Sequence, residues 1–244
     1  LHGPQQLAWL DRLDDEYGNI RAALNWAQES GAALAGLRLA TDLDFFWISR
    51  AHLQEPSMAL KNLLARPVPA DQIQLFARGH FLVGTLQWSG GNKMAGEAHL
   101  KESERLCLLL GTKGKVDLAR ARQMLNYFTS GTLIGAHEKE PDQVRKMYAE
   151  DLKLFQESGD QLRMAFMICH MGLELERSSD LIGARQAFEQ SLRLYRECGD
   201  MIGATFPNRS LVHIAVDEGN YAEARAQTEE ILHFHQQARL DSLI

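Results

Sequence analysis

The stretch LKLFQESGD, residues 152–160, recurs as LRLYRECGD at residues 192–200, and this repetition decides how the chain folds. Five of the nine positions are identical, and 192 − 152 gives a spacing of 40 residues. Glycine adopts the left-handed conformation that closes a helix, and a following aspartate can cap the next helix. Each Gly-Asp pair therefore predicts one helix end and one helix start, rather than a phosphate or metal loop.

Sequence periodicity around these phrases predicts paired helices. The apolar residues of segment 161–177 recur at spacings of four, three and four, which marks one face of an α-helix: Met164, Ile168, Met171 and Leu175. Segment 181–198 carries a second such stripe. Between the two, Ser178-Ser179-Asp180 offers side-chain oxygens to the free N–H groups of a helix start.

Apolar stripes earlier in the chain predict helices over residues 5–25 and 33–49, with a shorter partner over 58–65. Arg66-Pro67-Val68-Pro69 is the clearest break, because each proline disfavours helix in the residue before it. Asp71 is then expected to cap a helix that runs to Trp88. Convincing strand patterns are absent, so we predict an all-α, right-handed superhelix of antiparallel helix pairs.

The expected organisation is one continuous domain. Residues 1–66 form a helical lead-in and first helix pair, and residues 67–244 form repeats of about 40 residues. These repeats are expected at 71–111, 112–160, 161–200 and 201–240. Because 159 − 111 gives 48, the second carries about eight extra residues. We interpret the irregular segment 130–140 as a longer helix pair or an inserted loop, and as a candidate partner site.

Two resemblances follow from these residues. The pattern of small and aromatic residues resembles that of tetratricopeptide repeats of the longer, MalT-like kind. Gly172 stands at a close helix approach, Ala184 at the helix crossing, and Phe188 fills the gap between the helices. The match weakens one repeat later, where Val212 and Thr228 replace Gly172 and Phe188. The resemblance implies a scaffold that binds partners on its inner wall.

The second resemblance rests on residues 9–27, WLDRLDDEYGNIRAALNWA. This segment is similar to the one that joins the ATPase part to the repeat arm in bacterial LuxR and AfsR-type signal-transduction ATPases that regulate transcription. It implies that the chain is the sensor arm alone. The nucleotide-binding and DNA-binding modules of such a regulator would lie outside this sequence, so no residue here inherits their roles.

Composition excludes several function classes. The formal net charge is −6 and the isoelectric point is about 5.9, so general attraction to nucleic acid or anionic lipid is not expected. No apolar run is long enough for a membrane span, and the start has no signal pattern. Three scattered cysteines, Cys107, Cys169 and Cys198, are expected to be structural thiols of a reducing cytoplasm.

Motifs for catalysis, cofactors and metals fail on inspection. Gly111-Thr112-Lys113-Gly114-Lys115-Val116 lacks a phosphate loop's first glycine and final hydroxyl, and Gly90-Gly91-Asn92-Lys93 reads as a turn. His233 and His235 point to opposite sides of a helix, and His137-Glu138 lacks the second histidine of a zinc motif. We therefore predict a protein that is not an enzyme and has no cofactor and no metal site.

The remaining candidate is a binding surface on the first helix of each pair. Segment 161–177 has a second apolar stripe opposite the first, and two interpretations stay open: packing against neighbouring repeats, or an exposed ligand groove. The candidate residues are Arg78, Phe81, Thr85, Trp88, Phe166, Cys169, Leu173, Arg209, His213 and Asp217. The expected ligand is a protein, a peptide or a small effector. The alternative function is a free-standing adaptor for peptides or partner proteins.

Overall fold

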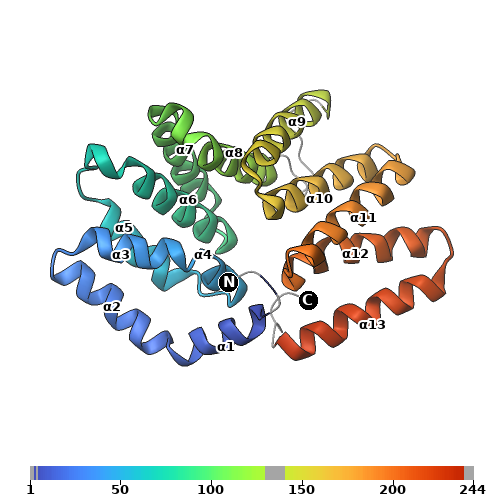
Figure 1. Cartoon of the computed structure of the whole chain (residues 1–244), viewed down its shortest axis with the longest axis horizontal. Helices are drawn as coiled ribbons and strands as arrows, with labels where there is room; N and C mark the ends of the chain where they lie inside the picture. Colours follow the sequence, from blue (N-terminus) through green and yellow to red (C-terminus); the bar gives the residue numbers. More distant parts are fainter. Residues whose placement is uncertain (1–2, 4, 130–140, 239–244) are drawn as a thin grey trace. The chain divides into compact units, whose positions relative to one another are not determined.

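The computed structural model describes residues 3, 5–129 and 141–238, and the predicted irregular segment 130–140 lies outside them. The described residues form helices and no strand, which confirms the all-α prediction (Figure 1). They divide into two compact units. Unit 1 lies within residues 8–128, and unit 2 lies within residues 2–7 and 129–244.

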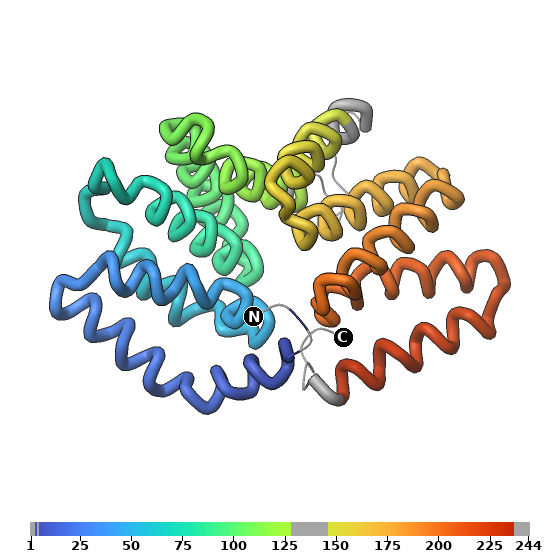
Figure 2. Tube along the Cα trace, in the orientation of Figure 1, coloured from blue at the N-terminus to red at the C-terminus, as the bar shows by residue number. Residues whose placement is uncertain are grey.

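Unit 1 is built from short helices followed by one long pair. Its helices are α1 (Gln6–Asp15, of which residues 6–7 belong to unit 2), α2 (Tyr17–Glu29), α3 (Ala33–Asp42), α4 (Asp44–Ser49), α5 (Gln54–Leu64), η1 (Ala70–Gln72), α6 (Ile73–Ser89), α7 (Lys93–Leu109), η2 (Gly111–Gly114) and α8 (Lys115–Thr129, ending in unit 2). Helices α6 and α7 run antiparallel side by side (Figure 2).

Three sequence expectations for unit 1 are wrong in detail. The helix expected over 5–25 is two helices that break at Glu16, and the helix expected over 33–49 breaks at Leu43. Asp71 does not cap α6: it lies in the 3-10 turn and accepts a hydrogen bond from the Gln72 side chain at 2.9 Å. Apolar periodicity alone does not report such breaks, because the stripe continues through them.

Unit 2 consists of two antiparallel helix pairs preceded by one helix. Its elements are α9 (Pro141–Ser158), α10 (Gln161–Arg177), α11 (Leu181–Glu197), α12 (Met201–Asp217) and α13 (Tyr221–Ala238). The core between α10, α11 and α12 buries Phe188, Leu192, Tyr195 and Leu211. Helices α10 to α13 fall within the repeats expected at 161–200 and 201–240.

The Gly-Asp phrases are helix joints, as predicted. Gly159 and Gly199 have φ values of +72° and +69°. Asp160 accepts a hydrogen bond from the Arg163 N–H at 3.1 Å, and Asp200 accepts one from the Gly203 N–H at 2.8 Å. The joint between α10 and α11 follows the same plan, with Asp180 as the cap at 2.9 Å and Ser179 at φ +62° in the glycine position. Each joint therefore ends one helix and starts the next.

Close helix approach explains the small residues of the repeat. A Cβ atom on Gly172 would lie 2.7 Å from the Phe188 ring, so the aromatic side chain occupies the space that glycine leaves. Ala184 is fully buried beside them. In unit 1 the backbones of α6 and α7 lie close together, since a Cβ on Gly96 would lie 2.8 Å from the Gly84 carbonyl oxygen. These contacts position the pairs on which any binding surface is built.

Candidate functional site

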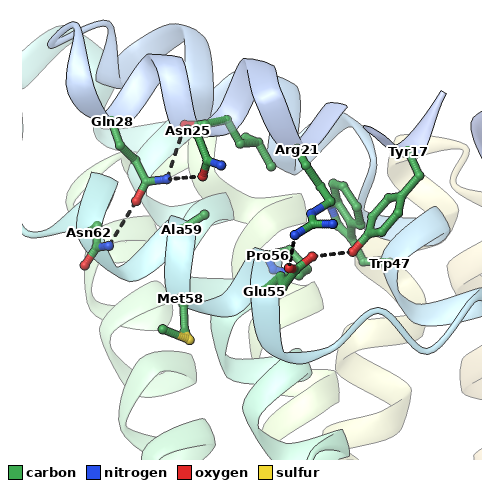
Figure 3. Close-up of a pocket in the computed structure, with 11 residues that line it drawn as sticks. Tyr17, Arg21, Asn25, Gln28, Trp47, Glu55, Pro56, Met58, Ala59 and Asn62 are labelled. Carbon is green, nitrogen blue, oxygen red and sulfur yellow. Dashed lines mark hydrogen bonds and ion pairs between the residues drawn. The ribbon is translucent and has the colours of Figure 1, made fainter. Parts of the chain in front are cut away.

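A groove in unit 1 runs between α2 and α5 and holds about 280 Å³ (Figure 3). We call it the α2–α5 groove. Helix α2 contributes polar side chains at Tyr17, Arg21, Asn25 and Gln28. Helix α5 forms the opposite wall with Glu55, Pro56, Met58, Ala59 and Asn62. The α2 wall is therefore polar, and the α5 wall is mixed.

The floor of the groove is apolar. Leu24 and Trp47 are 4% and 1% exposed, and both line the groove. The indole N–H of Trp47 donates to the Ala40 carbonyl at 2.9 Å, which satisfies its only polar group. Trp47 also packs against Phe46 with ring centroids 5.1 Å apart. The floor therefore offers apolar side chains to apolar parts of a ligand.

One end of the groove contains an ion pair next to stacked aromatic rings. Glu55 accepts a hydrogen bond from the Tyr17 hydroxyl at 2.7 Å and forms an ion pair with Arg21 at 2.6 Å. The Tyr17 ring stacks on His52 with centroids 4.1 Å apart. Burial and the hydrogen bond to Glu55 raise the pKa of Tyr17 to about 12, so the phenol is neutral at physiological pH. Arg21 and Glu55 are both about half exposed and can exchange partners with a ligand.

A row of carboxamides extends from this end along the groove. Asn62 donates to the Gln28 side-chain oxygen at 2.9 Å, and Gln28 donates to the Leu24 carbonyl and toward Asn25 at 3.3 and 3.4 Å. Each carboxamide carries both a donor and an acceptor. Within the described residues, the Asn62 oxygen and the Asn25 N–H groups are left for a ligand. This row suits groups that both donate and accept, such as a peptide backbone or another amide.

The predicted candidates on α6 differ in how far their side chains are exposed. Phe81 and Thr85 are buried at 6% and 4%, so they do not line an open wall. Thr85 donates to the Phe81 carbonyl at 3.0 Å, and the Arg120 guanidinium lies over the Phe81 ring at 5.0 Å. Arg78 is half exposed and pairs with the buried Asp117 at 3.1 Å. Trp88 is partly exposed at the end of α6.

The predicted candidates in unit 2 form a wall on α10 and α12. Phe166 and Leu173 are partly buried and pack against the core, whereas Cys169 is 5% exposed and belongs to it. Phe166 also packs on His170 with ring centroids 4.3 Å apart. On α12 the candidates Arg209, His213 and Asp217 are exposed. Packing and exposure are thus both present in the stripe of α10, and its binding role stays a prediction.

Charged groups of α12 influence the pKa values of two residues on α10. Burial raises the pKa of Glu176 on α10, while the nearby His213 lowers it and Asp217 raises it. The carboxyl group of Glu176 therefore faces the exposed row of α12. The wall is mixed in charge, and Arg209 lies close enough to lower the pKa of Cys169 against the effect of burial, which raises it to about 12.

The structure also describes the cysteines and most of the acidic and histidine side chains considered as candidate ligands. Cys107 and Cys169 are buried and Cys198 is half-buried, all three as free thiols, and burial raises the pKa of each. The described residues contain no cluster of three or more His, Cys, Asp or Glu side chains placed to hold a metal ion. His137-Glu138 lies outside the described residues. Across the same part of the chain, no helix is long and apolar enough to cross a membrane.

Sequence reasoning missed the α2–α5 groove. Its polar residues on α2, at 17, 21, 25 and 28, recur at helical spacing along one edge of the buried face formed by Ile20, Leu24 and Ala27. That periodicity was a usable signal. The opposite wall from α5 was not, because the pairing of α2 with α5 across α3 and α4 is a tertiary fact.

Comparison with known proteins finds solved structures with a similar fold. No protein-family profile and no curated protein matches the chain significantly. A solved structure of BtubC (BKLC) from P. vanneervenii is 14% identical with a TM-score of 0.61, over 95% of this chain and 90% of that one. A STAND (Signal Transduction ATPase with Numerous Domains) protein with a tetratricopeptide repeat sensor, PH0952 from Pyrococcus horikoshii, is 10% identical with a TM-score of 0.60.

The chain has a tetratricopeptide-like fold. Its likeness to the STAND protein extends over 93% of this chain but only 33% of that one. At 10% and 14% identity these likenesses concern the fold, and the functions named for the two proteins are theirs.

Proposed function

We propose that this tetratricopeptide-like chain is the sensor arm of a bacterial transcriptional regulator of the LuxR and AfsR signal-transduction ATPase type. In this role the arm binds an effector or a partner protein and is not itself an enzyme. ATPase and DNA-binding modules would belong to the full-length regulator. Binding would bias the regulator between a closed and an active state, as any ligand with unequal affinity for two states does.

The observation that carries the proposal is the likeness over 93% of this chain to a STAND protein that has a tetratricopeptide repeat sensor. The segment at 9–27, similar to the junction of LuxR and AfsR-type regulators, supports the same conclusion. Its second half forms α2, which is one wall of the groove. The proposal thus places effector binding beside the expected junction, where a bound ligand could influence the neighbouring module.

We assign effector binding to the α2–α5 groove, because it combines an apolar floor with an exchangeable ion pair and free carboxamide groups. The wall of Phe166, Leu173, Arg209, His213 and Asp217 is the second candidate surface. Ligand sites usually combine an apolar lining with a small number of polar groups.

The test screens the full chain against peptides and small amphipathic molecules by thermal melting. A ligand that binds only the folded state raises the melting temperature in proportion to RT ln(1 + [L]/Kd). For a ligand found in this way, Asn25→Ala/Asn62→Ala is expected to weaken binding about 5- to 150-fold, since each lost carboxamide bond contributes about 0.5–1.5 kcal/mol. Gln186→Ala, an exposed carboxamide on α11, is the matched control and should bind as the wild type.

Two outcomes separate the candidate surfaces. Binding that survives Asn25→Ala/Asn62→Ala but is lost in Arg209→Ala assigns the ligand to the wall of unit 2 and overturns the groove. Binding lost in neither variant overturns both assignments.

A second candidate function is a free-standing adaptor. It is favoured by the BtubC structure, in which a chain of similar extent has this fold over 90% of its length. The reading frame that encodes the chain discriminates between the two. An upstream nucleotide-binding segment supports the sensor arm, and a complete frame of this length excludes it.

A further inference from the structure

Three contacts in register hold α6 against α7 in unit 1. The Ser103 hydroxyl donates to the Ala77 carbonyl at 2.8 Å, and Gly84 lies against Gly96 at the other end. Between them, the Nδ1 atoms of His80 and His99 lie 2.9 Å apart. The residue numbers of the three pairs add to 180, 180 and 179, as expected for antiparallel helices in continuous register.

The same register recurs in unit 2 without the histidines. The Ser191 hydroxyl donates to the Ala165 carbonyl at 2.7 Å, and both residues lie 88 positions after their counterparts, since 191 − 103 and 165 − 77 each give 88. That offset places Ile168 at the position of His80 and Ala187 at the position of His99. One copy of the pair therefore has two apolar residues at the positions where the other has two imidazoles.

The two imidazoles meet head-on. Their centroids are 5.1 Å apart, which is close to the 2.9 Å between the nitrogen atoms plus the distance from each ring centre to its own nitrogen. The Nδ1 atoms therefore point at each other. A hydrogen bond at this distance needs one proton, carried by one nitrogen and accepted by the other. If neither or both Nδ1 atoms carry a proton, two lone pairs or two N–H groups face each other.

The head-on arrangement does not suit a metal ion. Two metal–nitrogen bonds of about 2.0–2.1 Å on a common line would place the nitrogen atoms about 4 Å apart. The 2.9 Å observed leaves room for a proton only.

We propose that His80 and His99 are a proton-controlled latch between α6 and α7, closed by one proton shared between their Nδ1 atoms and opened when each Nδ1 carries its own. Opening removes the middle contact of the register and loosens α6, which carries Arg78 and Trp88. The latch goes beyond the proposed binding function and does not depend on it.

The surroundings of the pair favour the closed state at neutral pH. Burial lowers the pKa of His80 to about 4, with His99 and Arg105 lowering it further and Glu102 raising it. Burial also lowers the pKa of His99, with Lys61 of α5 in the same direction and Glu102 opposing. Glu102 and Arg105 are paired with each other at 2.6 and 2.8 Å, and burial outweighs their effects on the pKa of both histidines.

The direction of the pH dependence follows from these shifts. A histidine whose pKa is lower in the folded chain than the unfolded value of about 6.5 binds more protons when unfolded. Its contribution to stability is complete above about pH 6.5 and is lost as the pH falls toward the folded value. Acidification below about pH 6.5 should therefore weaken the latch, in the same range as it acts on His52, whose pKa burial also lowers.

The test exchanges the pair for the residues that unit 2 uses at the same register, in His80→Ile/His99→Ala. Between pH 7 and pH 4.5 the folding equilibrium of the wild-type chain should fall about 10- to 100-fold more than that of this variant, as measured by denaturant unfolding. Because other histidines, such as the buried His170, are present in both proteins, their contribution cancels. Equal pH dependence in the two proteins would overturn the latch.

A second measurement does not require the variant to fold. In wild-type chain labelled with ¹⁵N at histidine, the latch predicts one protonated and one unprotonated Nδ1 for this pair at pH 7, lost together on acidification. His80→Gln and His99→Gln assign the signals. Two histidines that titrate independently near pH 6.5 contradict the proposal.

Discussion

At the scale of the residue, the helix joints fill the same left-handed position with different residues. Gly159 has φ +72° and open space where a Cβ would lie, whereas Ser179 holds φ +62° with a Cβ present. Left-handed backbone costs an L-residue about 1–2 kcal/mol. The joints therefore differ in stored strain although their hydrogen bonds match.

Exchanging the residues at these joints should shift stability in opposite directions. Gly159→Ala is expected to lower the free energy of unfolding by about 1 kcal/mol, because the change adds only backbone strain. Ser179→Gly should raise it by about 0.5 kcal/mol, since relief of strain is partly offset by the freer unfolded chain. Urea unfolding of both variants measures the effects, and a loss of stability in Ser179→Gly would show that the serine is not strained.

Gly172 provides a second test at this scale. In Gly172→Ala the new Cβ would lie 2.7 Å from the Phe188 ring, so we expect a loss of about 1–3 kcal/mol from overpacking. Phe188→Leu in the same chain makes room, and the double variant should lose less than the sum of the two single changes. A double-mutant cycle by thermal or urea unfolding gives the coupling. Additive losses would mean that the two residues do not press on each other.

At the scale of the element, a buried serine fastens the second helix of a pair to the first. Ser191 and Ser103 each donate to a carbonyl 26 residues earlier, on Ala165 and Ala77, and are 0% and 1% exposed. Equivalent bonds in both units indicate that the hydroxyl sets the sliding register of the pair. The directional hydrogen bond adds to the interlocking of side chains, such as Phe188 against Gly172, in fixing this register.

Removing these hydroxyls should therefore weaken each pair. Ser191→Ala and Ser103→Ala are each expected to lower the free energy of unfolding by about 0.5–1.5 kcal/mol. Ser89→Ala, at the exposed end of α6, is the matched control and should change stability by less than about 0.5 kcal/mol. If all three variants unfold alike in urea, the buried hydroxyls do not contribute net stability.

At the scale of the whole molecule, the chain is two compact units whose interiors are held differently. Unit 2 buries an aromatic and aliphatic core around Phe188 and Tyr195. Unit 1 adds a charged network in which the buried Asp117 accepts from Gln74 at 2.8 Å and pairs with Arg78 at 3.1 Å. Arg120 joins this network through Asp117 at 3.8 Å and also pairs with Asp44 at 3.0 Å.

Asp117→Asn should therefore act on one unit only. Removing the carboxylate charge while Arg78 and Arg120 remain is expected to destabilise unit 1 by about 1–3 kcal/mol. This range lies below the full cost of breaking a buried ion pair, because Arg78 is half exposed. Hydrogen exchange should lose protection in α4, α6 and α8 and keep it in α10 to α13.

Glu97→Gln is the control for this prediction. It breaks the exposed pair with Lys101 on α7, which is expected to contribute less than about 0.5 kcal/mol. Equal loss of protection in both units after Asp117→Asn would contradict the separate response.

The sequence by itself determined the local elements and their punctuation. Helix 161–177, the glycine and aspartate joints and the close approach at Gly172 were all predictable, because capping, left-handed backbone and helical periodicity are interactions among residues near in the chain. The breaks at Glu16 and Leu43 were not predictable in the same way, since the apolar stripes run on through them.

Tertiary structure decided what meets across elements. The α2–α5 groove joins residues such as Arg21 and Glu55, 34 positions apart, and the burial of Phe81, Thr85 and Cys169 depends on which helices pack over them. The facing of His80 and His99 likewise required the register of α6 on α7. Periodicity reports that a residue lies on an apolar or polar face, but packing of that face depends on long-range contacts that no local pattern encodes.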